Sequence, residues 1–163
     1  MTEIVCPEPL VALATDVYHT ARQKLIINGC LDPIAHLLRF DADAGAIREL
    51  GVIQMALSDQ PQQRDAVAGL LRLAVIQSGA NATIHVSDVW VSAADDIDVP
   101  SRHHPRLQEA LLVLVELNLV GKWMFVQTYS RVEGSVRIQQ GPPPPLEYAE
   151  GKGRFTGLFE ALG

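Results

Sequence analysis

Carboxylates and imidazoles are concentrated in one polar segment, residues 92–106. Carboxylate oxygen and imidazole nitrogen are common ligands of divalent cations in proteins. The segment therefore offers a candidate metal site, and its ligands would be Asp95, Asp96, Asp98, His103 and His104. The spacing matches neither an EF-hand loop nor the HExxH zinc motif. A solvated surface loop explains the same composition without a metal, and it is the simpler interpretation.

Three more residues that could contact a ligand lie just before this loop, in a strand-like run at residues 83–91. They are His85, Asp88 and Trp90. Trp90 shares a strand face with Asp88, so an aromatic ring would stand beside a carboxylate where the loop begins. His85 falls on the other face, and a half-buried histidine bonded to a neighbour explains it without a ligand. If the strand that holds His36 lies beside this one, the two imidazoles could converge.

Nucleophilic catalysis is not indicated. His85, Ser87 and Asp88 are the residue types of a hydrolytic triad, but Asp88 points away from the other two on a strand. The chain contains no G-x-S-x-G elbow. Its two cysteines, Cys6 and Cys30, form neither a CxxC pair nor a zinc spacing.

The C-terminal residues 141–163 differ in composition from the rest of the chain. Four consecutive prolines, residues 142–145, favour an extended polyproline II rod. An apolar stripe at helical spacing follows, made by Phe155, Leu158, Phe159 and Leu162. A helix this short is marginal in water by itself, so we expect the tail to dock on its own domain, a sister subunit or another protein.

Two segments show the apolar spacing of amphipathic helices. Residues 9–28 carry Leu10, Leu13, Val17, Ala21 and Leu25 at intervals of three and four, and Gly29 follows as a stop signal. The second helix is expected to start near residue 58, with Asp59 as a capping residue. Its predicted apolar face consists of Val67, Leu70, Leu71, Ala74 and Val75.

The remaining segments predict strands. Residues 33–40 alternate between two faces, and residues 46–57 could return as a second strand or form a short helix. Residues 83–91, 109–119 and 122–131 follow, and a further strand could form at 135–139. The middle one is apolar on both faces at its start, as expected for a central strand.

We therefore expect an α+β fold with a mostly antiparallel sheet of about five strands flanked by two main helices. The expected order is α-β-β-α-β-β-β, with a single domain at residues 1–140 and a tail helix within 141–163. This order resembles the profilin-like and roadblock-like folds, a resemblance of fold that implies no function.

Composition narrows the classes of partner. The formal net charge is −6, and lysine and arginine are scattered singly, which argues against nucleic acid and acidic membrane surfaces. The N-terminus resembles no signal peptide, and no apolar run approaches the roughly 20 residues that span a bilayer, so we expect a cytoplasmic protein. No cofactor is expected, apart from a divalent metal if the 92–106 loop binds one.

Two functions are compatible with these observations. The first is a non-enzymatic module that forms homo-oligomers and contacts other proteins, with the C-terminal tail as one contact. The alternative is a metal-dependent or small-molecule-binding enzyme with its site at the 92–106 loop.

Overall fold

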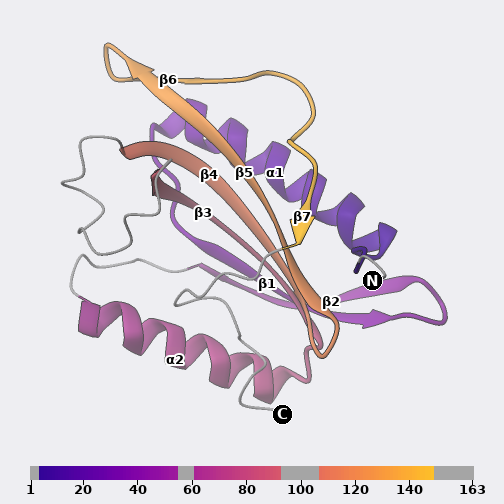
Figure 1. Ribbon diagram of the computed structural model, residues 1–163. Helices are drawn as coiled ribbons and strands as arrows, with labels where there is room; N and C mark the ends of the chain where they lie inside the picture. Colours follow the sequence, from indigo (N-terminus) through magenta and orange to yellow (C-terminus); the bar gives the residue numbers. More distant parts are fainter. Residues whose placement is uncertain (1–3, 55–60, 93–106, 149–163) are drawn as a thin grey trace.

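The computed structural model describes residues 4–54, 61–92 and 107–148 (Figure 1). This part of the chain is an α+β fold with two helices and one antiparallel sheet of seven strands. The predicted fold class is therefore confirmed. The elements in chain order are α1 (Glu8–Asn28), β1 (Ile34–Asp41), β2 (Ala46–Gln54), α2 (Pro61–Ser78), β3 (Ala82–Ser92), β4 (Leu107–Leu117), β5 (Gly121–Val132), β6 (Ser135–Ile138) and β7 (Glu147–Tyr148).

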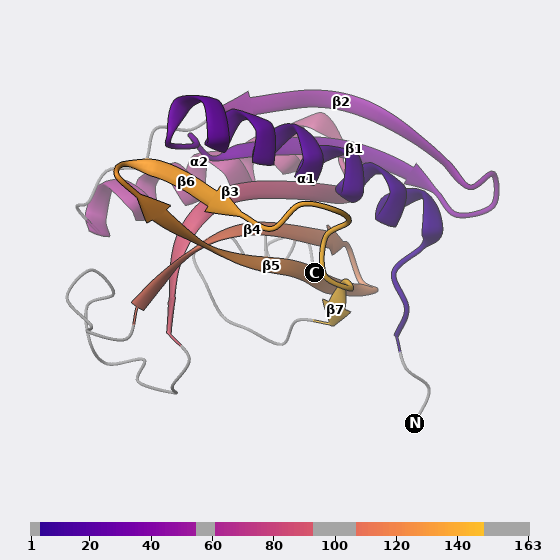
Figure 2. The ribbon, with the colours of Figure 1, turned by 90° about the horizontal axis from the view of Figure 1, so that it is seen from above.

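The strands lie in the order β2-β1-β3-β4-β5-β6, and β7 also pairs with β5. Helix α2 connects β2 to β3, which pairs with β1 rather than with β2. The predicted succession of helices and strands is confirmed, and the short strands β6 and β7 raise the number above the five expected. The sheet is strongly twisted, so the ends of β3 and β4 next to residues 93–106 turn away from β1 and β2 (Figure 2).

Helix α1 covers one face of the sheet and forms the larger core. The predicted stripe is confirmed, since Leu10, Val17, Ala21 and Leu25 are buried and Leu13 is partly buried. Opposite them stand alternate residues of the strands, which include Ile84, Val86, Val113, Trp123 and Phe125. The helix ends at Gly29, whose φ of 75° is the left-handed conformation that glycine adopts without strain.

Helix α2 lies against the opposite face, where it covers β1 and β2. Leu71 and Val75 form a small core with Ala35 and Leu37 of β1. The prediction for Leu70 is wrong: its side chain is 68% exposed. Leu70 and Leu71 are about 100° apart around the helix axis, and packing against the sheet buries Leu71 while Leu70 stays exposed.

The described part of the predicted tail returns to the domain. Arg22 donates a hydrogen bond to the carbonyl oxygen of Gly141 at 2.7 Å, and Leu146 packs against the larger core. The strand β7 then pairs with Trp123 and Met124 of β5. The apolar stripe at residues 155–162 lies outside the described residues, and its docking stays a prediction.

Neither α1 nor α2, the helices within the described ranges, is long and apolar enough to cross a membrane.

Candidate functional site

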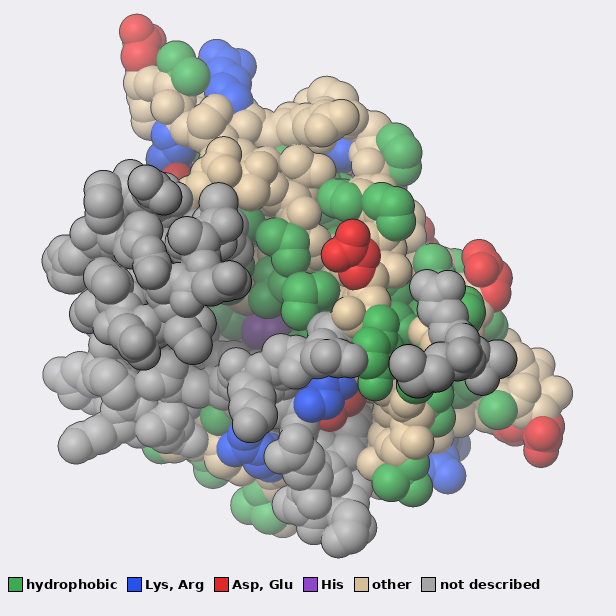
Figure 3. Space-filling view, viewed as in Figure 1, with side chains coloured by type: hydrophobic (Ala, Val, Ile, Leu, Met, Phe, Trp, Pro, Cys, Tyr) green, Lys and Arg blue, Asp and Glu red, His purple; other side chains and the backbone are tan. Residues whose placement is uncertain are grey.

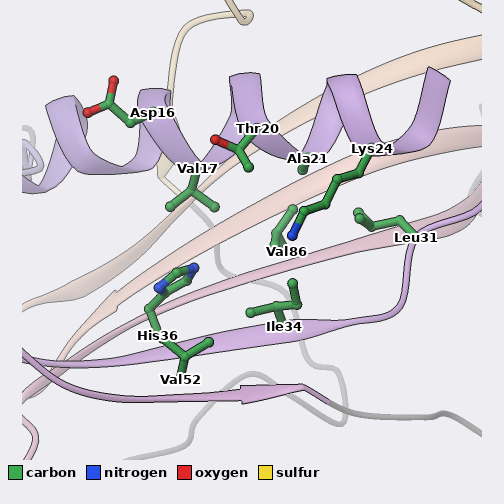
Figure 4. Close-up of a pocket in the computed structure, with 10 residues that line it drawn as sticks. All are labelled: Asp16, Val17, Thr20, Ala21, Lys24, Leu31, Ile34, His36, Val52 and Val86. Carbon is green, nitrogen blue, oxygen red and sulfur yellow. The ribbon is translucent and has the colours of Figure 1, made fainter. Parts of the chain in front are cut away.

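A groove with a volume of about 240 Å³ runs between helix α1 and strands β1 and β2 (Figure 4). Its helix wall is made by residues three and four positions apart, which share one side of α1. Its floor comes from β1, β2 and β3. The apolar lining consists of Val17, Ala21, Leu31, Ile34, Val52 and Val86, and the polar lining of Asp16, Thr20, Lys24 and His36.

The polar residues of this groove differ in the direction of their side chains and in their partners. The side chain of Lys24 extends from α1 toward the strands, whereas the carboxylate of Asp16 points away from them (Figure 4). The ring of His36 rises from β1 toward the helix, and its Nδ1 lies 3.4 Å from Oε2 of Glu49 on β2. Within the described part of the chain, the Lys24 ammonium has no ion pair and no hydrogen bond. The groove therefore combines apolar walls with one ammonium that no other described group engages.

A second group of polar side chains lies on the same face of the sheet, toward the ends of β3 and β4. This polar group consists of Asp88, Glu109, Tyr129 and Arg131. Arg131 donates a hydrogen bond from Nε to Oε2 of Glu109 at 2.8 Å, and its guanidinium lies 5.8 Å from the ring centroid of Tyr129. Asp88 belongs to this group for two reasons. It pairs with Leu111 of β4, which packs in the α1 core, so Asp88 lies on the same face of the sheet. The charge of Asp88 also acts on Tyr129. Glu109, Tyr129 and Arg131 were not predicted as site residues, since only the pairing of strands brings them to Asp88.

Burial changes the pKa values of Asp88 and Tyr129 in this group. It raises the pKa of Asp88, and the nearby Glu109 adds to the increase, while backbone N–H groups, including that of Leu31, and the charge of Arg131 act in the opposite direction. Burial and the charges of Glu109 and Asp88 raise the pKa of Tyr129 to about 12. Asp88 is thus more readily protonated than an exposed aspartate, and Tyr129 keeps its proton at neutral pH.

His85 does not belong to that group. It lies on the opposite face of the sheet, where it is only 3% exposed and pairs across the ladders with Ala35 and Leu114. Burial lowers its pKa to about 4, so its imidazole is neutral near pH 7. The predicted ligand residues His85 and Asp88 are therefore not brought together. The backbone of Trp90 pairs with that of Glu109, and its side chain lies outside the described residues.

The predicted metal ligands Asp95, Asp96, Asp98, His103 and His104 also lie outside the described residues, so the metal site stays a prediction. Among the residues that the structure describes, no three His, Cys, Asp or Glu side chains are grouped so that they could hold a metal ion.

The outer face of α2 is a third candidate site, because it exposes apolar side chains. Leu70, Leu73 and Ile76 are 68%, 48% and 40% exposed, and they lie on the side of the helix opposite the buried Leu71 and Val75. Other exposed apolar side chains occur elsewhere, and Figure 3 shows several on the side of the molecule seen in Figure 1. Those on α2 are distinctive because they form a stripe at helical spacing.

No protein-family model matches the chain, and no curated protein or solved structure matches it either.

Proposed function

We propose that this protein is a non-enzymatic interaction module that self-associates through the outer face of α2. The supporting observation is the exposed stripe of Leu70, Leu73 and Ile76. A helix that is apolar on both faces is typical of a helix packed between two layers. The sheet supplies one layer, and a second copy of the chain would supply the other.

The composition of this face favours a symmetric helix pair. Arg72 is the only charged residue among residues 66–78, and it lies to one side of the stripe. Gly69 directly precedes the stripe in the sequence and lies on the same side of the helix as Leu73 and Ile76, and there is open space where a Cβ would project from it. A small residue at this place allows two helices to approach closely, and a twofold axis would bring each stripe against its copy.

Sedimentation equilibrium of the full chain tests the proposal. At about 100 µM, a dimer with a Kd near 1 µM would be almost fully assembled. We expect a dimer for the wild-type chain and a monomer for Leu73→Glu, because the substitution places a charge at the centre of the interface. The matched control is Ile27→Glu on α1, whose side chain is 80% exposed and outside the stripe; it should remain dimeric. A monomeric wild-type chain, or a dimeric Leu73→Glu variant, would refute the proposed interface.

Two expectations accompany this proposal. The partner would be a protein rather than nucleic acid or a membrane surface, which accords with the net charge of −6. The cytoplasm is the expected location. A chain that ends at Tyr148 would show whether the C-terminal segment contributes to association, since it keeps β7 and removes the predicted stripe at residues 155–162.

The alternative of a metal-dependent enzyme at the 92–106 loop stays open to a direct test. Elemental analysis of untagged protein, together with the variants His103→Ala and His104→Ala, would detect a bound divalent ion and assign its ligands. Wild-type protein without metal, and without a thermal shift on addition of Zn²⁺, Mn²⁺ or Mg²⁺, would remove this alternative.

A further inference from the structure

We propose that the groove between α1 and strands β1 and β2 binds a small amphipathic carboxylate, an anion with a short aliphatic or aromatic body. The groove volume of about 240 Å³ is smaller than the roughly 300–1,000 Å³ of sites for drug-sized molecules, so it suits a small ligand. This site does not depend on the proposed α2 interface, because α1 and α2 lie on opposite faces of the sheet.

The apolar walls select the body of the ligand. Val17 of α1, Ile34 of β1 and Val86 of β3 face the same space from three elements (Figure 4). An aliphatic chain or a small ring seated between them would be removed from water, and such burial contributes about 25 cal/mol per Å² of apolar surface. A fully polar ligand, such as a sugar or a free phosphate, would leave most of its groups without partners on these walls.

The charge in the groove selects the head group. The Lys24 side chain is directed toward the strands and meets no other described partner, so its ammonium can donate to a carboxylate. Thr20 lies one turn earlier on α1 and lines the same groove, and its hydroxyl is a second donor. The two acids nearby do not compete for Lys24, since Asp16 points away and Glu49 is occupied by His36. The arrangement favours an anion over a cation.

The probes for a test are benzoate and hexanoate, with benzamide and hexanamide as neutral molecules of nearly the same shape. Titration followed by ¹H–¹⁵N correlation spectra should shift the resonances of α1 residues 16–24 together with those of β1 and Val86. We expect saturable binding of at least one carboxylate and at least tenfold weaker binding of its amide. The reverse preference, equal binding of both, or no binding of either carboxylate up to millimolar concentration would overturn the proposal.

Variants at exposed positions of α1 make the test specific without endangering the fold. Lys24→Gln keeps much of the stem and removes the charge, so we expect at least a tenfold loss of carboxylate affinity, and Lys24→Arg should retain binding. The control is Gln23→Ala, the adjacent exposed residue, which does not line the groove and should bind as the wild type does. Undiminished binding by Lys24→Gln would show that the groove does not recognise the anion as proposed.

Discussion

His36 and His85 lie on paired strands, yet their side chains leave opposite faces of the sheet. In the antiparallel ladder of β1 and β3, His85 stands opposite Ala35, and His36 stands opposite Ile84. His36 therefore lines the groove under α1, while His85 is buried on the face that α2 partly covers. His36 shares a face with Ile84, and Ile84 is adjacent to His85 in β3. Because adjacent residues of a strand point to opposite sides, the two imidazoles cannot converge on one ligand.

The burial of His85 predicts a loss of stability in mild acid. Its pKa is lowered from 6.5 to about 4, so the unfolded chain binds a proton between these values while the folded chain does not. The contribution of a neutral His85 is complete above pH 6.5 and is lost as the pH falls toward 4. The free energy of unfolding should decrease by on the order of 3 kcal/mol across this window.

Urea denaturation at pH 7 and pH 4.5 measures this effect, and His85→Gln isolates it. The glutamine does not titrate, so the variant should lose less stability between the two pH values than the wild type does. The same pH dependence in both proteins would show that other groups cause the acid sensitivity.

Removal of the Arg131 guanidinium should destabilise the polar group on the α1 face. Arg131→Gln leaves Glu109 without its 2.8 Å hydrogen bond, and we expect a cost on the order of 1 kcal/mol because the pair is partly exposed. The pKa of Asp88 should also rise, since the charge of Arg131 lowers it. Carboxyl NMR titration follows that pKa. Arg137→Gln on β6, an exposed arginine, is the control and should change neither quantity.

Two glycines of the α2 region should respond in opposite ways to alanine. Gly69 is inside the helix with open space around it in the single chain, so Gly69→Ala should stabilise the fold by about 0.5–1 kcal/mol when it is made in the Leu73→Glu background, where the proposed helix pair does not form. Gly79 follows the helix with a φ of 75°, where a Cβ is strained, so Gly79→Ala should destabilise it by roughly 1 kcal/mol. Thermal denaturation at one protein concentration compares them. A loss of stability in Gly69→Ala would contradict the open environment of that residue.

The side chain of Asn81 extends the pairing of β1 and β3 beyond its backbone. Its Oδ1 accepts a hydrogen bond from the backbone N–H of Phe40 at 2.7 Å, and its Nδ2 donates to the Phe40 carbonyl at 2.8 Å. Asn81→Asp keeps the acceptor but sets a carboxylate against that carbonyl, so we expect a loss of about 2 kcal/mol in urea denaturation. Asn118→Asp, in the turn after β4, is the control and should cost much less.

Local patterns predicted the elements well because each pattern reports burial within one segment. The spacing of Leu10, Val17 and Leu25 identified α1 and its buried face, and this prediction is confirmed. In β5, which lies in the predicted strand range 122–131, the buried Trp123 and Phe125 alternate with the less buried Met124 and Val126, as the period of two in a strand requires. The same reasoning failed at Leu70, where two adjacent leucines fit one apolar stripe and packing against the sheet selected only Leu71.

The sequence by itself determined the types of the elements, their order and most of their buried faces. Helix and strand periodicity can be recognised from the spacing of apolar residues within one short segment. Only the tertiary structure decided which polar side chains meet. Asp88, Glu109 and Arg131 come from β3, β4 and β5, and Lys24 and His36 approach one groove from a helix and a strand. These relations depend on strand order and register, which arise when the whole chain packs and are not encoded in any one segment.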